Sequence, residues 1–375
     1  MTDQTVIVGA GPAGLAVAAM LGERGAAYTV LERAGSVGSS WRSRYDSLHL
    51  HTARWLSALP GAPIPRSYGL WVPRDDLVTY LDDYADRFHI KPEFGVEVNR
   101  IERDPAGWRI ETSAGTRLAT TVVLATGYSR TPFVPEWAGR ESFPGPFAHS
   151  STYKEPSAYR DKQVLVVGAG NSAAEIAVEL ADVTPEVLLS VRTPPNIVRR
   201  DVLGLPSQVF GIALRRVPES LMNPLGGLLR RLTVPDLDEY GLPAPAGDGF
   251  TQFLRSQTVP ILDHGFVAAV RKGRIRVVPA VESMDGQDVY LADGQIVRPD
   301  AMIAATGYRP DLGPLVGDLG VLDESGSPKA HGAQTMAEAP GLYFVGIDVL
   351  LAGLLREIAH EAEEVSRKVE VQPAT

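Results

Sequence analysis

The sequence predicts an α/β fold made of two doubly wound parallel sheets, with the second domain inserted into the first. The first observation is a repeat: a strand, a glycine-rich loop, a helix and a second strand occur twice, with loops that begin at Gly9 and Gly168. The second is a pair of matching Ala-Thr-Gly-Tyr turns at 125–128 and 305–308, each after an apolar run. A chain of 375 residues is long enough for two domains of about 150 residues.

The first copy of the repeat starts close to the N-terminus. An apolar strand is predicted over Thr5–Val8, followed by the loop Gly9–Gly14, a helix over Leu15–Arg24 and a strand over Tyr28–Leu31. Gly25 ends the helix, as glycine commonly does after a last helical turn. Such a unit binds a dinucleotide when its loop carries glycines at this spacing.

The second copy has the same order of elements. A strand is predicted over Gln163–Val167, then the loop Gly168–Ala173, a helix over Ala174–Ala181 and a strand over Val187–Val191. Ala173 takes the place of the third glycine, which is an accepted variant. Two copies of one unit predict two dinucleotide-binding (Rossmann-like) domains in one chain.

The remaining stretches complete the expected fold. Asp75–Phe88 has the apolar spacing of a helix, and Val96–Arg117 alternates like a small β-meander. Residues 194–260 are irregular and rich in Pro and Gly. Leu350–Val369 reads as an amphipathic helix, which we expect to pack on the first domain.

These patterns give the domain boundaries. We expect residues 1–150 and 308–375 to form the first domain and residues 151–307 the inserted one, with a lid-like insert at about 194–260. The apolar side chains of the insert favour a lid over a substrate channel, and a membrane-surface helix beside its arginine pairs is the less favoured alternative. These side chains are Phe210, Leu214, Met222, Leu225, Leu228, Leu229 and Leu232.

Composition excludes several classes of function. The net charge of −9 removes the basic surface that a dedicated nucleic-acid binder needs, so nucleic acid is not expected as a partner. The absence of cysteine excludes disulfides, thiolate metal sites and dithiol redox chemistry, and we expect no metal. The chain enters its first strand without a signal-peptide pattern, and its apolar runs are short, so we expect a cytoplasmic protein without stable membrane insertion. Only six of the 36 basic residues are Lys, which suggests a bacterial source.

The glycine loops carry the first chemistry. The first glycine permits the tight turn, the second lets the backbone approach a pyrophosphate, and the third lets helix and strand pack closely. The pyrophosphate then lies at the positive end of the helix. Glu32 ends the second strand at the spacing required of a carboxylate that binds a free ribose 2′-hydroxyl.

The end of the corresponding strand in the second copy is different. The chain there reads Ser190-Val191-Arg192 and offers a hydroxyl and a guanidinium instead of a carboxylate. This combination predicts a 2′-phosphate, hence NADP rather than NAD. A solvated Arg192 without a ligand is the plain alternative, and the pair Arg199-Arg200 is a weaker candidate for the same phosphate.

A family resemblance is carried by the run Phe143–Tyr153. It matches the FxGxxxHxxxY fingerprint and stands just before the second glycine loop. In this respect the chain resembles the class B flavin-containing monooxygenases. The amino-acid sequences of Leu48–His51 and Val259–Gly265 are most similar to those of the YUCCA-like branch and its bacterial relatives.

The resemblance implies an FAD- and NADPH-dependent monooxygenase. In that family NADPH reduces the flavin, oxygen forms a C4a-hydroperoxide, and one oxygen atom passes to a small organic substrate. N- or S-oxygenation and oxidative decarboxylation of a 2-oxo acid both remain open. The alternatives are an NADPH-dependent flavoprotein reductase without oxygen insertion and, less favoured, a nucleotide-binding redox sensor. The expected partners are the substrate and molecular oxygen, and a homodimer would be unsurprising.

The resemblance also points to His51, Trp41 and His149 as catalytic candidates. His51 occupies the place where many members of the family carry an Asn over the flavin, and Arg54 occupies the place of a Lys. His51 is therefore expected either to guard the reactive flavin or to pack beside it. Trp41 is expected against the flavin, and His149 is expected to couple domain rotation to NADP binding.

The candidate cofactor-binding residues share positions in the glycine loops, at strand ends and in the turns between domains. They are Gly9, Gly11, Pro12, Ala13, Gly14, Glu32, Arg33, Ser40, Trp41, Arg42, His51, Val98, Ala125, Thr126, Gly127, Gly168, Gly170, Asn171, Ser172, Ser190, Arg192, Ala305, Thr306, Gly307, Tyr308, Gly346 and Asp348.

Overall fold

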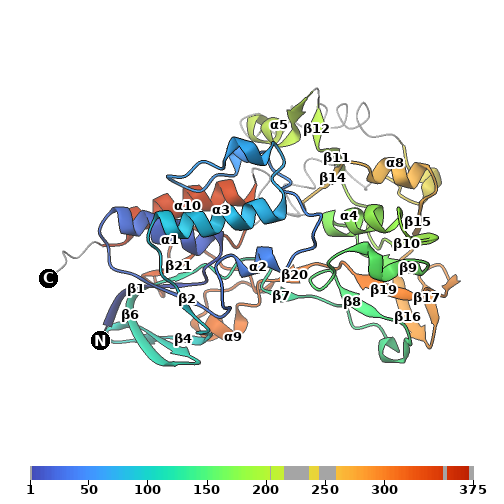
Figure 1. The fold of residues 1–375 in the computed structure, drawn as a ribbon. Helices are drawn as coiled ribbons and strands as arrows, with labels where there is room; N and C mark the ends of the chain where they lie inside the picture. Colours follow the sequence, from blue (N-terminus) through green and yellow to red (C-terminus); the bar gives the residue numbers. More distant parts are fainter. Residues whose placement is uncertain (1, 203, 215–235, 245–258, 349–352, 371–375) are drawn as a thin grey trace. The chain divides into compact units, whose positions relative to one another are not determined.

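The computed structural model describes residues 2–202, 204–214, 236–244, 259–348 and 353–370. The chain divides into two compact units, each drawn in Figure 1. Unit 1 comprises Met1–Ser43, Leu48–Thr131 and Tyr308–Thr375, and unit 2 comprises Arg44–Ser47 and Pro132–Gly307.

These boundaries differ from the expected ones at two places. Residues 132–150, expected in the first domain, belong to unit 2, because the strand Phe147–His149 pairs with the strand Ala301–Ala304 in the sheet of that unit. The four residues 44–47 also belong to unit 2, although the chain before and after them lies in unit 1. The chain returns to unit 1 between Gly307 and Tyr308, which is the boundary expected from the repeated turn.

The sheet of unit 1 has seven strands in the order β3-β2-β1-β6-β5-β4, with β21 also paired to β6. Strands β1, β2, β3 and β21 run parallel to their neighbours, whereas β4, β5 and β6 form the expected antiparallel meander. The strands are β1 (Thr2–Val8), β2 (Thr29–Glu32), β3 (Glu93–Phe94), β4 (Val98–Asp104), β5 (Gly107–Thr112), β6 (Gly115–Leu124) and β21 (Leu342–Phe344).

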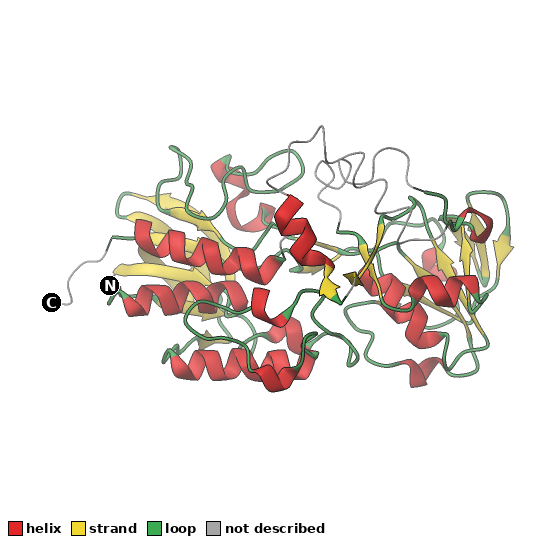
Figure 2. Cartoon of the chain, turned by 90° about the horizontal axis from the view of Figure 1, so that it is seen from above, coloured by secondary structure: helices red, strands yellow, loops and turns green. Residues whose placement is uncertain are grey.

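Three long helices pack on one face of this sheet. They are α1 (Pro12–Glu23), α3 (Arg74–Arg87) and α10 (Leu354–Lys368), and Figure 2 shows them beside one another over the strands. The expected closing helix thus packs on the first unit, against α1; residues 350–352 of the expected range lie outside the described residues. Two shorter helices are α2 (Ser39–Arg42) and α9 (Gly313–Val316).

Strand β1 shows why both faces of the sheet are covered. Ile7 packs in the core cluster formed with the three long helices, whereas Val6 and Val8 point to the other face and pack with the meander and α9. Successive side chains of a strand point to opposite faces, so a strand that is apolar throughout must be buried on both.

Unit 2 contains a five-stranded parallel sheet in the order β15-β10-β9-β19-β8. Its strands are β8 (Phe147–His149), β9 (Gln163–Val167), β10 (Glu186–Ser190), β15 (Ile275–Val278) and β19 (Ala301–Ala304). Helices α4 (Asn171–Leu180) and α8 (Phe266–Arg271) pack together. A small antiparallel sheet follows, with strands β16 (Val281–Asp285), β17 (Asp288–Leu291) and β18 (Ile296–Val297).

Short elements complete the described chain. They are β7 (Thr131–Pro132), β11 (Ile197–Arg199), β12 (Asp201–Val202), β13 (Leu205–Pro206), α5 (Ser207–Leu214), β14 (Ile261–Asp263), β20 (Tyr308–Arg309) and 3-10 turns at Arg54–Leu56, Arg66–Tyr68, Arg140–Ser142, Pro156–Tyr159, Asp238–Tyr240 and Gly317–Leu319. β11 pairs with β14 in parallel.

The expected lid falls largely outside the described residues. This applies to Met222, Leu225, Leu228, Leu229 and Leu232, so the lid stays a prediction. In the described chain, no helix combines the length and the apolar character needed to cross a membrane.

Candidate functional site

The first glycine loop has the geometry that a dinucleotide requires. Gly9 has φ +110°, and a Cβ placed there would lie 2.7 Å from Ala125 O. A Cβ on Gly14 would lie 1.9 Å from Gly9 O, so only glycine allows α1 to approach β1 this closely. A Cβ on Gly11 would meet nothing within 4 Å, which leaves the open space that a pyrophosphate needs.

Helix α1 presents its first turn to this open space. Gly11 caps the helix without a side-chain hydrogen bond, and Pro12 occupies the first helical turn. The first N–H groups of a helix have no partner within the helix and attract an anion. The buried hydroxyl of Thr126 also has no hydrogen-bond partner among the described residues, and Thr126 stands beside Gly9. Both features fit a bound dinucleotide.

Glu32 ties this loop to the end of β2. Its side chain is buried, and the two carboxylate oxygens accept the backbone N–H groups of Ala10 and Ala34 at 2.7 and 2.8 Å. Each oxygen keeps a second lone pair for a ribose hydroxyl. The predicted ribose-binding carboxylate therefore also fixes the loop.

Two further segments reach the same loop. The N–H of Gly38 donates to Ala10 O at 3.0 Å and starts α2, whose Trp41 packs against the core around α1. A Cβ on Gly346 would lie 2.8 Å from Ala13 Cβ, so the turn after β21 contacts the start of α1. The structure thus gathers the following predicted residues around one loop: Gly9, Gly11, Pro12, Ala13, Gly14, Glu32, Ala125, Thr126 and Gly346.

Other candidates of unit 1 have structural partners. Arg42 pairs with both oxygens of Asp82 at 2.5 Å, and Arg33 is exposed with a guanidinium nitrogen 3.9 Å from Glu97. Val98 is buried in the core with the strands of the meander. Their cofactor contacts remain predictions, as do those of Ser40, Gly127 and His51; Leu50, next to His51, packs in the same cluster as Ala13.

A cluster of titratable groups supports the turn at Gly346. The N–H of Gly346 donates to Glu361 Oε2 at 2.8 Å, and burial raises the pKa of Glu361 to about 7. Asp348 Oδ2 lies 3.0 Å from His331 Nδ1, and this hydrogen bond raises the pKa of His331. The sequence predicts the closing helix but gives no sign of this contact between Glu361 and Gly346.

The second glycine loop repeats the geometry of the first. Gly168 has φ +142°, and a Cβ there would lie 2.3 Å from Ala305 O. Gly170 caps α4 without a side-chain hydrogen bond and leaves open space, as Gly11 does. Each Ala-Thr-Gly-Tyr turn therefore packs against the first glycine of its own loop, which explains why the two motifs recur together.

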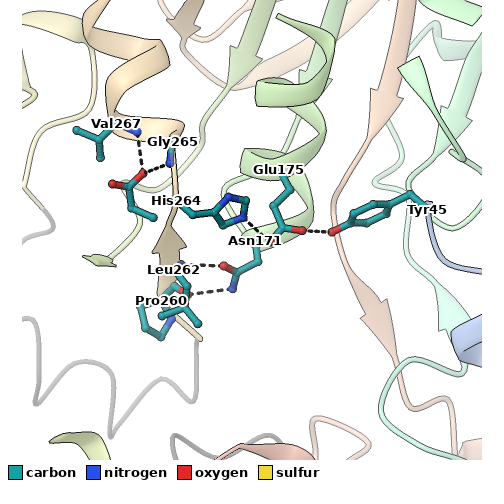
Figure 3. A network of polar contacts seen from close by, with 9 residues as sticks. Tyr45, Asn171, Glu175, Pro260, Leu262, His264, Gly265 and Val267 are labelled. Carbon is teal, nitrogen blue, oxygen red and sulfur yellow. Dashed lines mark hydrogen bonds and ion pairs between the residues drawn. The ribbon is translucent and has the colours of Figure 1, made fainter. Parts of the chain in front are cut away.

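The first residues of α4 are fixed by side-chain contacts, shown in Figure 3. The Asn171 amide donates to Pro260 O at 2.9 Å and accepts the N–H of Leu262 at 2.8 Å. This joins the start of α4 to β14. Asn171 therefore has a structural role at the start of α4, and its predicted contact with the cofactor remains a prediction because one N–H of the amide is not used by these two bonds.

The two residues predicted to select NADP have different surroundings. Ser190 is buried, and its hydroxyl donates to Pro279 O at 2.9 Å, so it is not free to donate to a phosphate. Arg192 is exposed and has no hydrogen bond or ion pair within the described parts of the chain. The 2′-phosphate hypothesis is therefore carried by Arg192.

His149 links the fingerprint to the turn at the end of unit 2. Its Nδ1 accepts the backbone N–H of Ser151 at 3.1 Å, which leaves the proton on Nε2, 3.0 Å from Gly307 O. Burial lowers the pKa of His149, so the ring is neutral at pH 7. Thr306 donates to Phe133 O at 2.5 Å in the same turn. A neutral His149 thus holds the last residue of unit 2.

Three polar residues near α4 were missed by sequence reasoning. The hydroxyl of Tyr45 donates to Glu175 Oε2, and His264 Nε2 lies 3.3 Å from Glu175 Oε1 (Figure 3). Their positions in the sequence are far apart. Only the excursion of residues 44–47 into unit 2 brings Tyr45 to α4, and no local pattern signals it.

Comparisons with known proteins agree with this geometry. The pyridine nucleotide-disulphide oxidoreductase family matches residues 6–202. The probable indole-3-pyruvate monooxygenase YUCCA4 of Arabidopsis thaliana is 33% identical over 368 residues, covering 96% of this chain and 89% of that protein. The indole-3-pyruvate monooxygenase YUCCA1 of Oryza sativa subsp. japonica is 36% identical over 349 residues, covering 91% and 86%.

Solved structures show the same fold. A flavin-containing monooxygenase from Stenotrophomonas maltophilia is 25% identical with a TM-score of 0.73 and covers 98% of both chains. Cyclohexanone monooxygenase from Rhodococcus sp. Phi1, bound to NADP⁺, is 18% identical with a TM-score of 0.72, covering 98% of this chain and 84% of that one. The predicted two-domain α/β fold is confirmed.

The predictions of FAD and NADPH as cofactors and of a monooxygenase reaction are also confirmed, and the reductase alternative is not favoured. The two glycine loops, each before an uncapped helix, fit two dinucleotides. The chain belongs to the pyridine nucleotide-disulphide oxidoreductase family and, within it, to the flavin monooxygenases that include the YUCCA enzymes.

Proposed function

We propose that the chain catalyses the oxidative decarboxylation of an aromatic 2-oxo acid of the indole-3-pyruvate type. The observation that carries this proposal is the identity of 33% to 36% with indole-3-pyruvate monooxygenases over more than nine tenths of the chain. In this reaction the acid, O₂, NADPH and a proton give the acid shortened by one carbon, CO₂, water and NADP⁺. N- or S-oxygenation of a small molecule is the alternative within the same class.

The proposal assigns one nucleotide to each loop. The loop Gly9–Gly14 and the first turn of α1 hold the FAD pyrophosphate, with Glu32 at a ribose hydroxyl. The loop from Gly168 and the first turn of α4 hold NADPH, with Arg192 at the 2′-phosphate. When bound, the flavin would accept two electrons from NADPH and activate oxygen.

The three catalytic candidates have distinct proposed roles. Trp41 and His51 exclude water from the flavin and position its surroundings, and neutral His149 holds the Gly307 turn during domain movement. His51→Ala should retain FAD but convert more NADPH into hydrogen peroxide and less into product. The measurement is the ratio of product to peroxide, and an unchanged ratio would show that His51 only packs.

A bacterial source, a cytoplasmic location and an apolar lid over the substrate remain part of the same proposal. A homodimer remains an open expectation, which light scattering of the purified protein tests.

Substrate class is tested by stoichiometry. The purified holoenzyme is given NADPH and oxygen with indole-3-pyruvate, phenylpyruvate, a thioether or a tertiary amine, and CO₂, oxygenated product and NADPH are measured. The proposal predicts one CO₂ per NADPH with the 2-oxo acids and little product from the others. Oxygenation of the thioether or amine without CO₂ from either acid would contradict the decarboxylation and favour the alternative.

A further inference from the structure

Residues 44–47 connect two stretches of unit 1 but pack in unit 2. The N–H of Asp46 donates to Lys154 O at 2.9 Å, and Lys154 Nζ donates to Arg44 O at 3.1 Å. The side chain of Ser47 forms a hydrogen bond with Glu179 on α4. This short segment is therefore fixed to unit 2 along its whole length.

Tyr45 is the buried centre of this segment, with 2% of its surface exposed. Its hydroxyl donates to Glu175 Oε2 and also forms a hydrogen bond with Ser172. Its ring contacts that of Tyr153 edge to face, with centroids 6.2 Å apart. Burial and the neighbouring Glu175 raise the pKa of Tyr45, so its hydroxyl remains a donor.

The contacts of Tyr45 lie at the nucleotide-binding end of α4. Ser172 and Glu175 are in the first two turns after the Gly170 cap. Asn171 ties the same end to β14 on another side, through the backbone of Pro260 and Leu262 (Figure 3). The start of α4 is thus held on one side by β14 and on the other by a segment that continues into unit 1.

The chain on either side of Tyr45 carries the two flavin-facing candidates of the proposed function. Trp41 lies four positions before Tyr45, in α2, and His51 lies six positions after it. A chain spans at most about 3.5 Å per residue, so Trp41 lies within about 14 Å of Tyr45 along the chain and His51 within about 21 Å. The segment 44–47 and both candidates therefore belong to one short, continuous stretch of chain.

We propose that residues 44–47 form a strap through which the nucleotide-binding end of α4 positions Trp41 and His51, and that Tyr45 is the positioning residue of this strap. The proposal rests on the proposed function, because it takes α4 as the NADP site. It predicts that nucleotide binding at α4 alters the flavin surroundings through the hydroxyl of Tyr45, independently of any contact that the nucleotide itself makes with the flavin.

The chain offers a matched control in Tyr153. Its side chain is equally buried, and its hydroxyl donates to Glu179 Oε2 at 2.8 Å, one helical turn farther along α4. Tyr45→Phe and Tyr153→Phe each remove one buried hydroxyl from a carboxylate of the same helix. Tyr153 lies outside the strap, and Tyr153→Phe keeps both its ring, which contacts Tyr45, and the Glu179 carboxylate, which also binds Ser47. A general loss of stability therefore affects both variants, whereas loss of the Tyr45 hydrogen bond affects only one.

The experiment uses the FAD-loaded protein and NADP⁺ as the probe. Titration calorimetry gives the dissociation constant of NADP⁺, and the visible flavin spectrum at saturating NADP⁺ reports the flavin surroundings without turnover. We expect Tyr45→Phe to weaken NADP⁺ binding about tenfold, the size expected for a hydrogen bond to a charged group, and to abolish most of the spectral change. In Tyr153→Phe, the dissociation constant of NADP⁺ and the size of the spectral change should both stay within about twofold of their values in the original protein.

A second pair of variants guards against misfolding of Tyr45→Phe. Glu175→Gln keeps an oxygen that accepts from Tyr45 and should preserve the spectral change, whereas Glu175→Leu should remove it. Equal effects of Tyr45→Phe and Tyr153→Phe, or an unchanged spectral response in both Tyr45→Phe and Glu175→Leu, would overturn the strap. Failure of the unsubstituted protein to bind NADP⁺ would instead refute the assignment of α4, and so the two failures are distinguishable.

Discussion

The two glycine loops have nearly the same backbone but differ where they meet the nucleotide. In both, the first glycine has positive φ and packs against an Ala-Thr-Gly turn, and the second leaves open space before an uncapped helix. At the end of the second strand, however, Glu32 binds its own loop, whereas Arg192 has no partner in the described chain. The comparison favours the proposal that each loop holds a pyrophosphate and that the strand end after it selects the nucleotide.

The third loop position shows the largest physical difference. Gly14 admits no Cβ because Gly9 O would lie 1.9 Å from it, whereas the second loop already accommodates Ala173. Gly14→Ala should therefore force the backbone apart and cost about 3 kcal/mol or more of stability, with loss of FAD. Ala173→Gly should cost only about 1 kcal/mol through helix propensity.

Urea unfolding and the flavin content of the purified variants measure this contrast. Equal destabilisation by Gly14→Ala and Ala173→Gly would contradict the conclusion that only the first loop lacks room for a Cβ at its third position.

The next largest expected effect is a pH dependence of the free energy of unfolding. It comes from the buried carboxyl group of Glu361, which binds the N–H of Gly346. The pKa of Glu361 rises from 4.5 to about 7 on folding, so between these values the folded state binds more protons than the unfolded chain. Stability should therefore fall as pH rises from about 4.5 to about 7, by roughly 2 to 3 kcal/mol. Asp348, His331 and Glu357 face this group and modulate it.

Glu361→Gln tests this dependence, because Gln still accepts the N–H of Gly346 but does not titrate. Its free energy of unfolding should fall less than that of the unsubstituted protein between pH 4.5 and 5.5, a range in which His331, with an ordinary pKa of 6.5, stays protonated in both states. Parallel curves for the two proteins would exclude Glu361 as the cause.

Arg192 sharpens the comparison at the second loop. Arg192→Ala should raise the apparent KM for NADPH about tenfold, because a charged hydrogen bond to the 2′-phosphate is lost, and should leave the KM for NADH nearly unchanged. Steady-state kinetics with both cofactors measure this, with Arg271→Ala, at the exposed end of α8, as the control for loss of a positive charge elsewhere in unit 2. If NADPH and NADH were affected equally, Arg192 would not be the phosphate ligand.

The smallest effect is expected at Ser190, which precedes Arg192 by two positions. Its hydroxyl is already bound to Pro279 O inside the sheet. Ser190→Ala should therefore cost about 1 kcal/mol of stability and leave the preference for NADPH over NADH unchanged. A reduced preference, measured with the same kinetics, would return Ser190 to the phosphate site.

The sequence predicted the features that depend on local spacing. The order of glycines around Gly9 and Gly168 and the acidic residue Glu32 follow from a short pattern, and the structure places all of them at the loops. The strand β9 also has its predicted ends, because an apolar run between polar residues defines it locally.

Features that depend on packing between distant segments were not predictable in this way. The strand β8 joins the second sheet through pairing with a strand more than 150 residues away, which moved the first boundary from 150 to 131. Tyr45 and Glu361 bind carboxylate and backbone partners supplied by other elements, and nothing in their own neighbourhood marks them as buried. The hydrogen bond of Ser190 to Pro279 O likewise joins residues 89 positions apart, so no local pattern in the sequence indicates it.

The central claim is that electrons from a nucleotide at the second loop serve oxygen transfer at a flavin held by the first. The most direct measurement is turnover of the holoenzyme with NADPH, ¹⁸O₂ and the 2-oxo acid, followed by mass spectrometry of the product. The account predicts one ¹⁸O atom in each molecule of shortened acid and one such molecule per NADPH oxidised. Oxidation of NADPH with all of the label in hydrogen peroxide or water, and none in any product of the substrate panel, would contradict it.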